Sequence, residues 1–597
     1  METRHTIRSF HNTCTELFII HNAFTCSVCA SSIVYIYYLF TQLYTSAKRI
    51  YYVTQGRTQR ICNKLLPILW LDTSASTTTG AERVLSIRSP LELGRMYLPW
   101  LILGAVISIW LVWRYRHRRM IRMAREIPGP PTVPLLGNAL RFMGQPEDLL
   151  NEIQRLLLKY GNVVRFWLGP DLNIVVNDPD DLKLLLTSPK TSVKGPQYKY
   201  MADVLGGGIL SGSGPLWRKH RKIAMPNYGK RAIESYSNVF NSEADILIQD
   251  LRKARGQIDA YDYIIQATSY AVCQTLMGLT RQQTMNLPHF RKIVENVPRL
   301  YNIVFDRMTK WYLQIDPLFW MTESYRAQRY CLKIISEFCN AIIRHRVVKL
   351  NTLECDMDLL NTDQDSVANA KLSVIDRFIL SQELNSDELM HETLTVFTSS
   401  QEATGKIAAY LILMMAFHPT CQDKLYGEIA SVLGDKDRPV TDEDLKQMPY
   451  LEMVFKEIVR LFPIGAMLQR TVIEDITISS CTIPAGSSLV APVYQLQRDP
   501  RFWDKPEEFD PERFSAENIK LRNPNCYIPF SAGPMDCLGR YFGTKLVKTI
   551  CVKVLKEFEV TSLQTYKDLK VIIAISVQSV IGYPIVLKPR IKSNTDS

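Results

Sequence analysis

The sequence predicts a mainly α-helical protein with a smaller β region, preceded by a transmembrane helix. Its 597 residues, 46% of them hydrophobic, are enough to bury a large core. From about residue 150 onward helical patterns dominate, with short β-like pieces between them. Residues 96–113 contain no charged side chain, and at about 1.5 Å per residue a helix of this length crosses most of a bilayer core.

The composition favours membrane and protein partners. A formal charge of +12 suits an acidic partner, but no basic-aromatic repeat or zinc-finger spacing accompanies it. Much of the positive excess lies beside the apolar segment, so we expect no nucleic-acid partner. The 13 cysteines lack the dense pairing of a small secreted scaffold, which predicts reduced thiols in a cytosol-facing domain.

Residues 1–95 form an extension without a pattern that we can assign to a function. They are rich in Ser, Thr, Tyr and Cys and include an uncharged stretch from Leu17 to Ala47. Three explanations stay open: a second membrane segment, a targeting peptide, or a mis-assigned start of the chain.

A basic flank and a proline-rich segment follow the apolar stretch. Six arginines lie from Arg114 to Arg125 with no acid before Glu126, which places the rest of the chain on the cytoplasmic side. Four prolines in IPGPPTVPLLGN, residues 127–138, favour extended backbone. The expected segments are a transmembrane anchor at 96–113, a basic stop-transfer and proline-rich hinge at 114–138, and a folded domain at 139–597.

Local patterns predict the main elements of the folded domain. NVVRFWLG at 162–169 and VIIAISV at 571–577 read as strands. The longest helix begins near Ser386, a capping residue, and ends at His418 and Pro419. At roughly 32 residues this helix is about 48 Å long, so it must cross the whole domain.

Cys537 lies in PFSAGPMDCLGRYFG, residues 529–543, just before apolar residues that recur at helical spacing. We therefore expect the thiol at a helix N-terminus, where free N–H groups and the helix dipole stabilise a thiolate. Gly533 and Gly539 would let the backbone and a flat ligand approach closely. Taken alone, Cys537 also fits a buried structural cysteine.

With its neighbours, this cysteine loop resembles that of the cytochrome P450 family of haem-thiolate monooxygenases, Phe-x-x-Gly-x-Arg-x-Cys-x-Gly. Phe530, Gly533, Cys537 and Gly539 match it. The resemblance covers roughly residues 127–590 and is of the microsomal type. WRKHRK and the long helix are similar to the fatty-acid-hydroxylating branch, the family 4 clan of animal and insect members. The resemblance implies the cytochrome P450 fold and a natural start at Met96.

Companion motifs lie at the distances that the family requires. Glu457 and Arg460 in KEIVRLFP match its Glu-x-x-Arg and lie three residues apart on one helix face. The resemblance implies that Arg513 in FDPERF completes a buried triad with them and holds the cysteine loop. Trp217 and Arg221 in PLWRKHRK match Trp-x-x-x-Arg, which donates to a haem propionate.

The family's chemistry follows as an expectation. Arg470 takes the place of a further propionate contact, and Cys537 becomes the axial ligand of haem b, whose thiolate favours O–O cleavage. One oxygen atom enters a lipophilic substrate, which is a fatty acid, a terpenoid or hormone-like signal, or a foreign compound. Electrons come from NADPH through NADPH–cytochrome P450 reductase, with cytochrome b5 as a second candidate partner. The basic balance suits an acidic redox partner.

The resemblance places the catalytic domain on the cytosolic side of the endoplasmic reticulum membrane, in contact with membrane lipid. A mitochondrial member is the alternative, because residues 1–60 hold six Arg or Lys against two acids. The apolar segment and the PGPP hinge argue for the microsomal location.

The groove for oxygen activation departs from the family's Ala/Gly-Gly-x-Asp/Glu-Thr. Glu402 keeps the acid, but Ala403 replaces the threonine, and Thr404 lies one residue later, about 100° round the helix. We take Glu402 and Thr404 as the candidate catalytic residues. The missing hydroxyl is then absent or supplied by Thr404, Ser400 or water.

Two further departures concern the haem. Met535 replaces the arginine of the cysteine loop, and losing one charge-assisted bond costs about 1.5 to 3 kcal/mol. Ser399 occupies the position of a glutamate that can esterify haem in the resembling branch, so no covalent link is expected. The competing hypothesis is a haem protein with impaired oxygen activation, as a ligand binder, an isomerase-type member or a non-functional paralogue.

Overall fold

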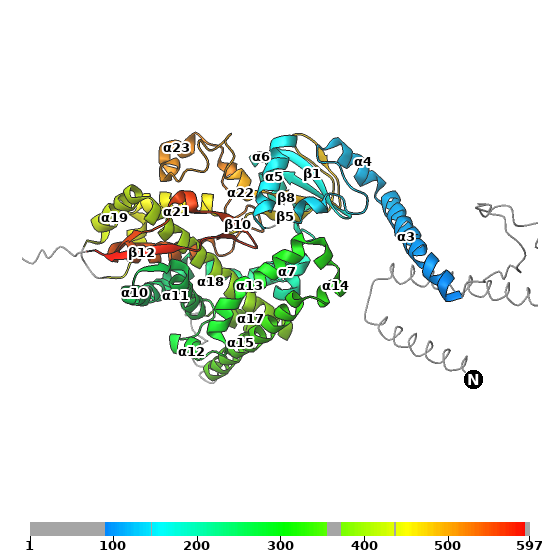
Figure 1. Cartoon of the computed structure of the whole chain (residues 1–597). Coiled ribbons are helices and arrows are strands. Elements are labelled where there is room, and N and C mark those ends of the chain that lie inside the picture. The colour runs from blue at the N-terminus through cyan, green and yellow to red at the C-terminus, as the bar shows by residue number, and fades with distance from the viewer. Residues whose placement is uncertain (1–89, 145, 355–371, 435–437, 591–597) are drawn as a thin grey trace, which may run out of the picture. The chain divides into compact units, whose positions relative to one another are not determined.

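The computed structural model describes residues 90–144, 146–354, 372–434 and 438–590 (Figure 1). The side chains of residues 90–99 lie outside this description, and so does almost all of the extension 1–95 with its three explanations. The chain separates into two compact units, Met1–Tyr97 and Leu98–Ser597. The second unit contains the folded body.

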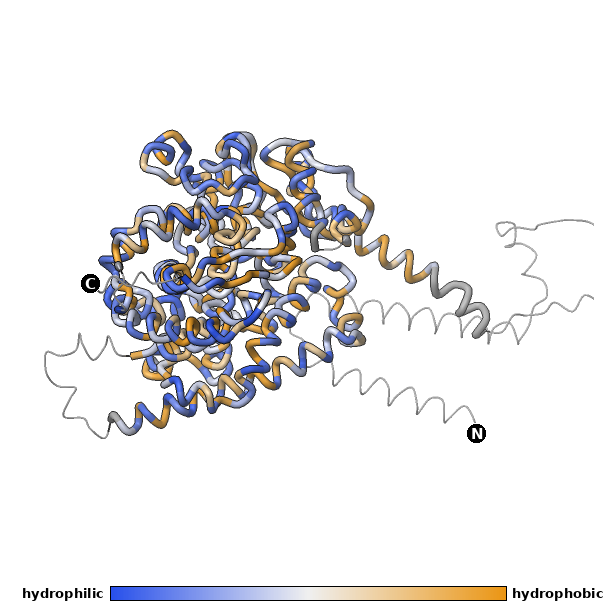
Figure 2. The backbone as a smooth tube through the Cα atoms, turned by 60° about the vertical axis from the view of Figure 1, so that its left-hand side comes forward, coloured by the Kyte–Doolittle hydropathy of each residue, from blue (hydrophilic) through white to orange (hydrophobic). Residues whose placement is uncertain are grey.

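Helix α3 (Pro90–Arg116) covers the predicted anchor. Every residue from Trp100 to Ile109 is exposed, and Figure 2 shows the hydrophobic character of this part of the helix. Side chains 96–99 of the predicted anchor lie outside the described residues. Within the residues that the structure describes, no helix has the length and apolarity needed to cross a membrane.

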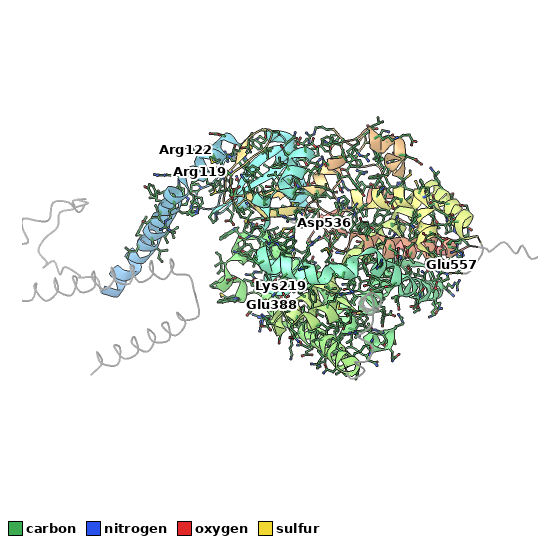
Figure 3. All side chains as sticks on the ribbon, turned by 180° about the vertical axis from the view of Figure 1, so that it is seen from behind. Arg119, Arg122, Lys219, Glu388, Asp536 and Glu557 are labelled. Carbon is green, nitrogen blue, oxygen red and sulfur yellow. The ribbon has the colours of Figure 1, made fainter. Side chains whose placement is uncertain are left out.

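Helix α4 (Arg118–Glu126) follows and attaches to the folded body. It buries Met120 and Ala124, while Arg119 and Arg122 project from it (Figure 3), and Arg119 forms an ion pair with Asp475. The proline-rich segment after α4 packs on the body. Both ends of this segment form hydrogen bonds with the strand at residues 163–168. Arg165 N–H donates to the Pro128 carbonyl at 2.8 Å, and Asn138 N–H donates to the Trp167 carbonyl at 2.6 Å.

The largest sheet has five strands in the order β1-β2-β8-β5-β3. The β1–β2 hairpin confirms the strand predicted at 162–169, and β2 pairs parallel with β8, far along the chain. The strands of this sheet are β1 (Val163–Leu168), β2 (Asp171–Val176), β3 (Val193–Lys194), β5 (Leu468–Thr471) and β8 (Ser488–Ala491).

Smaller β elements lie around the helical body. β4, β12 and β9 form a three-stranded sheet, and β6–β7 and β10–β11 are hairpins. Their bounds are β4 (Gln257–Asp259), β6 (Ile476–Thr477), β7 (Thr482–Ile483), β9 (Phe558–Thr561), β10 (Val571–Ile573), β11 (Val577–Ser579) and β12 (Pro584–Pro589). The single strand predicted at 571–577 is wrong, because residues 574–576 form a turn in which Ala574 N–H donates to Ser576 O at 3.1 Å.

Helices make up most of the folded body (Figure 1). They are α5 (Pro146–Tyr160), α6 (Pro179–Thr187), α7 (Tyr198–Leu205), α8 (Gly214–Ala224), α9 (Lys230–Ser235), α10 (Ser237–Lys253), α11 (Ala260–Thr275), α12 (Arg281–Met285), α13 (Phe290–Thr309), α14 (Asp316–Trp320), α15 (Glu323–Glu354), α17 (Val374–Ser381), α18 (Ser386–Phe417), α19 (Pro419–Leu433), α20 (Asp442–Lys446), α21 (Pro449–Leu461), α22 (Val493–Leu496), α23 (Ala516–Lys520) and α24 (Arg540–Glu557).

Helix α18 is the predicted long helix and has 32 residues. Its cap is Asn385, one residue before the predicted Ser386, because the Asn385 side chain accepts from Glu388 N–H while Glu388 accepts from Asn385 N–H. Its residues 407–416 are all buried, and it packs against α11, α15, α21 and α24. The helix therefore forms the centre of the core and one wall of the site described next.

Candidate active site

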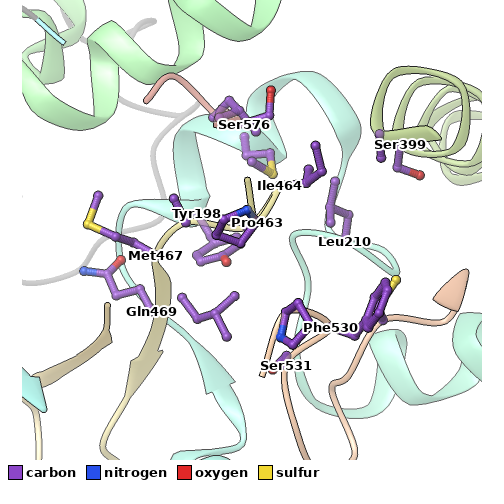
Figure 4. A pocket seen from close by; sticks show the side chains of 18 of the residues that line it. Tyr198, Leu210, Ser399, Pro463, Ile464, Met467, Gln469, Phe530, Ser531 and Ser576 are labelled. Carbon is purple, nitrogen blue, oxygen red and sulfur yellow. The ribbon is translucent and has the colours of Figure 1, made fainter. Parts of the chain in front are cut away.

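A cavity of about 510 Å³ lies between α8, α18 and three chain segments. The segments are 463–470 around β5, 529–539 before α24, and 573–576, the last residue of β10 with the turn after it. Figure 4 shows labelled side chains from these separate parts around the space, among them Ser399, Ile464 and Phe530. The lining is largely apolar, with a few polar groups. Such a cavity suits a lipophilic ligand.

Cys537 lines this cavity, two residues before the N-cap of α24. Its side chain is accessible from the cavity, although the surrounding protein atoms desolvate the sulfur. Burial raises the pKa of the Cys537 thiol, and the Gly539 N–H opposes this effect, as do Arg221 and Arg540. The Gly539 N–H at the helix end thus lowers the pKa of Cys537 in the predicted direction, but burial outweighs this effect. A coordinated metal ion deprotonates such a thiol outright.

The loop before Cys537 is fixed by backbone contacts. Cys537 N–H donates to Phe530 O at 2.9 Å. Gly533 has φ +76°, and a Cβ there would lie 2.4 Å from Leu186 O, so the loop needs glycine at this position. A Cβ at Gly539 would meet only Tyr228, at 3.9 Å. The close approach of backbone is therefore found at Gly533, while at Gly539, which lines the cavity, the close approach of a flat ligand stays a prediction.

Positive side chains gather at one corner of the cavity, where Lys194, Arg221 and Arg470 all belong to its lining. Burial lowers the pKa of Lys194 far below its usual value, and the charges of Arg470 and Arg221 lower it further. Burial also lowers the pKa of Arg470, which is 2% exposed. Three cations crowded into a largely apolar cavity favour a ligand that brings negative charge.

Arg221 is the cation with an acidic partner in this corner. It donates to the Asp536 carboxylate at 2.6 Å and to the Asp536 carbonyl at 2.8 Å, which ties α8 to the cysteine loop. The guanidinium carbon lies 5.7 Å from the Trp217 ring centroid, and the buried Trp217 also lines the cavity. Met535, the residue in place of the loop arginine, lines the cavity too and is 9% exposed.

Glu457 and Arg460 form a two-bonded ion pair that is wholly buried. Arg460 donates to the two carboxylate oxygens at 2.6 and 2.8 Å. Arg513 approaches Glu457 at 3.5 Å, and its Nη groups donate to the carbonyls of Asp504 and Lys505. The three residues thus lie together as the resemblance implied.

Gln497, which the sequence analysis missed, connects this ion pair to the cysteine loop. Its side-chain amide donates to the Arg460 carbonyl at 2.9 Å, and its carbonyl oxygen accepts from Ile528 N–H at 3.2 Å. Arg460 in turn donates to the Gln497 backbone carbonyl at 2.9 Å. The pair therefore fixes α21 to the segment that leads into the loop.

Glu402, Ala403 and Thr404 of α18 all line the cavity. The Thr404 hydroxyl donates to the backbone carbonyl of Ser400 at 2.7 Å, so its proton is already engaged. Glu402 accepts a hydrogen bond from Lys406, which the sequence analysis also missed. On this wall of the cavity, Glu402 therefore has a partner, Lys406, that the family motif does not include.

Comparison with known proteins identifies the fold that holds this cavity. The family model described as Cytochrome P450 matches residues 127–576. The chain belongs to the cytochrome P450 family. The recognition from the cysteine loop is confirmed, as are the mainly helical P450 fold with its small sheet region and the activity class of a haem-thiolate monooxygenase.

Several curated cytochromes P450 are similar over most of their length. Cytochrome P450 4c3 of Drosophila melanogaster is 29% identical over 504 residues, which are 82% of this chain and 94% of the relative. Cytochrome P450 4V2 of Homo sapiens is 29% identical over 512 residues, 84% of this chain and 93% of the relative. These relatives confirm a family-4-like cytochrome P450.

The sequence of this P450 offered different signals for the three residues that the sequence analysis missed. Lys194 is a single lysine in a two-residue strand, and only the fold brings it to Arg221 and Arg470. Gln497 had no motif. Lys406 follows Glu402 at the i, i+4 spacing of a helical ion pair, so this contact could have been predicted.

Proposed function

We propose that this P450 is a membrane-anchored monooxygenase that inserts one oxygen atom from O2 into a lipophilic substrate, with electrons from NADPH. The main support for this proposal is the largely apolar cavity, which is lined by the Cys537 thiol and by the corner of three cationic side chains. A fatty acid, a terpenoid or hormone-like molecule, or a foreign compound fits the class of ligand that such a lining accepts.

The residues of the cavity fit a haem. A porphyrin with two carboxylates suits the corner of Lys194, Arg221 and Arg470, because two negative charges would balance these side chains, of which Arg221 also pairs with Asp536. Trp217 lies in the same corner. Cys537 would hold the haem iron through its thiolate, and the haem would supply the oxidising chemistry with O2. Phe530, Gly533 and Gly539 form the loop around the ligand, and Glu457, Arg460 and Arg513 hold that loop from behind.

The cavity-lining residues of α18 would deliver protons to the reacting end of the cavity. Glu402 is the candidate acid of the cavity. Thr404 donates its proton to the Ser400 carbonyl, so its oxygen can only accept a hydrogen bond unless it rotates. The apolar lining excludes bulk water from the reacting end of the cavity.

Membrane attachment is the part of the proposal that rests on α3. Within the part of the chain that the structure describes, the largely apolar residues from Trp100 to Ile109 are all exposed, which favours a lipid environment. The arginines at its C-terminal end, Arg114 and Arg116 in its last turn, suit the cytosolic face of the endoplasmic reticulum membrane. On that face the chain would meet NADPH–cytochrome P450 reductase and cytochrome b5.

Reductase-dependent turnover tests the proposal. With purified reductase and NADPH, a panel of fatty acids, terpenoids and foreign compounds should include substrates that yield oxygenated product and stimulate oxygen uptake. The competing hypothesis of a ligand binder or isomerase-type member gains support from Ala403 and from the engaged hydroxyl of Thr404. It predicts ligand-induced spectral shifts without reductase-dependent product for any compound.

A further inference from the structure

A buried lysine in the middle of α18 contacts the candidate acid. Lys406 is 3% exposed, and its Nζ donates to Glu402 Oε1 at 2.5 Å and to Ser576 Oγ at 2.6 Å. Ser576 Oγ in turn donates to the same Glu402 oxygen at 3.2 Å. Lysine is almost never fully buried unless it is paired. The three side chains therefore form a closed polar cluster, which we call the Lys406 triad.

The Lys406 triad joins two walls of the cavity. Glu402 and Ser576 both line it, Glu402 from α18 and Ser576 from the turn between β10 and β11. Lys406 lies behind them, outside the lining, so it contacts the cavity only through these two residues. Ser576 also brings a hydroxyl to the acid, whereas Ala403 has none and Thr404 donates to backbone.

The other groups that face Glu402 do not neutralise it. Tyr261 of α11, Tyr301 of α13 and Tyr583 before β12 surround it, and burial raises the pKa of each, with the Glu402 charge raising it further. These hydroxyls therefore stay neutral. Among the described residues, Lys406 is the cation that hydrogen-bonds Glu402.

We propose that Lys406 is a positioning residue, which keeps Glu402 ionised and, with Ser576, fixes that carboxylate to the cavity wall in place of the missing threonine hydroxyl. The proposal deepens and rests on the proposed function, in which Glu402 is the carboxylate that accepts protons and passes them on to the cavity. Removing one partner of a buried ion pair leaves an uncompensated charge, and a buried carboxyl then takes up a proton.

Infrared spectroscopy of the holoprotein tests the charge of Glu402 without turnover. Lys406→Met should show, at neutral pH, a carboxylic-acid C=O band that the unsubstituted protein lacks. The band should shift with 13C-labelled glutamate and disappear in the double variant Glu402→Gln/Lys406→Met. Lys406→Arg keeps the cation and should show no band. Lys553→Met is the matched control, because Lys553 is a buried lysine of α24 that pairs with Asp245.

Absence of the Glu402 band in folded Lys406→Met overturns the proposal, and so does its presence in Lys406→Arg. If Lys406→Met does not fold, Lys406→Gln is measured in the same way, with the same two outcomes. Failure of the proposed function is a separate result, because missing reductase-dependent product in the unsubstituted protein leaves the infrared comparison intact.

Discussion

Two sides of the cavity differ in how well family motifs predict their contacts: the cysteine side, which is the loop 529–539 with the Glu457–Arg460 pair behind it, and the α18 side around Glu402. On the cysteine side, residues that match a known motif meet as the motif implies: Glu457 pairs with Arg460, and Gly533 fits where a side chain would collide. On the α18 side, a departure at Ala403 is accompanied by partners from elsewhere, Lys406 and Ser576. In this chain, the motifs predicted the contacts between their own residues. They did not predict which residues contact Glu402 where the motif threonine is missing.

The largest expected effect is on the cysteine side. Glu457→Ala should destabilise the protein by about 3–5 kcal/mol, because it leaves Arg460 buried without its partner. Urea unfolding measures the loss. Glu512→Ala is the control, since Glu512 and its partner Lys424 are about half exposed and such pairs contribute about 1 kcal/mol or less. Equal effects of the two variants would contradict the role of the buried pair.

Substitution of the two glycines of the loop tests whether the backbone requires glycine at each position or whether the position only matches the motif. Gly533→Ala should cost about 1–3 kcal/mol from its positive φ alone, and the contact with Leu186 O adds to this. Gly539→Ala should cost less, because its φ of −83° suits alanine and the space is open. Thermal unfolding of both variants measures the difference, and a larger loss for Gly539→Ala would refute the explanation.

The cationic corner offers a test of the residue that departs from the loop motif. Met535→Arg should slow the loss of haem on the order of tenfold, since a restored charge-assisted hydrogen bond is worth about 1.5 to 3 kcal/mol. Transfer of haem to an acceptor protein measures the rate. Met535→Leu keeps the apolar volume and should leave the rate unchanged. If both variants behave alike, Lys194, Arg221 and Arg470 already balance the propionates.

The smallest expected effect is on the α18 side. Ala403→Thr should raise the fraction of NADPH consumption that yields product, by less than about tenfold, because a hydroxyl alone supplies part of a general-acid effect. Ala403→Val has the same shape without the hydroxyl and is the control. Equal yields from the two variants, over several substrates, would show that Ala403 does not limit proton delivery.

The same contrast explains what the sequence could predict. Strand β1 and the long helix α18 follow from local periodicity, and the Glu457–Arg460 pair follows from its spacing on one helix. Lys194 and Gln497 could not be found, because their partners are distant in sequence and meet only in the fold. The raised pKa of Cys537 was missed because burial depends on tertiary packing, whereas the helix end was visible in the sequence.

The most direct measurement is the carbon monoxide difference spectrum of the reduced holoprotein, with Cys537→Ala and Cys526→Ala beside it. Cys526 is buried outside the cavity lining and serves as the control cysteine. If Cys537 is the axial ligand, the protein and Cys526→Ala show the thiolate-type Soret shift and Cys537→Ala loses it. The same spectrum in Cys537→Ala and in the unsubstituted protein would contradict the assignment of the site.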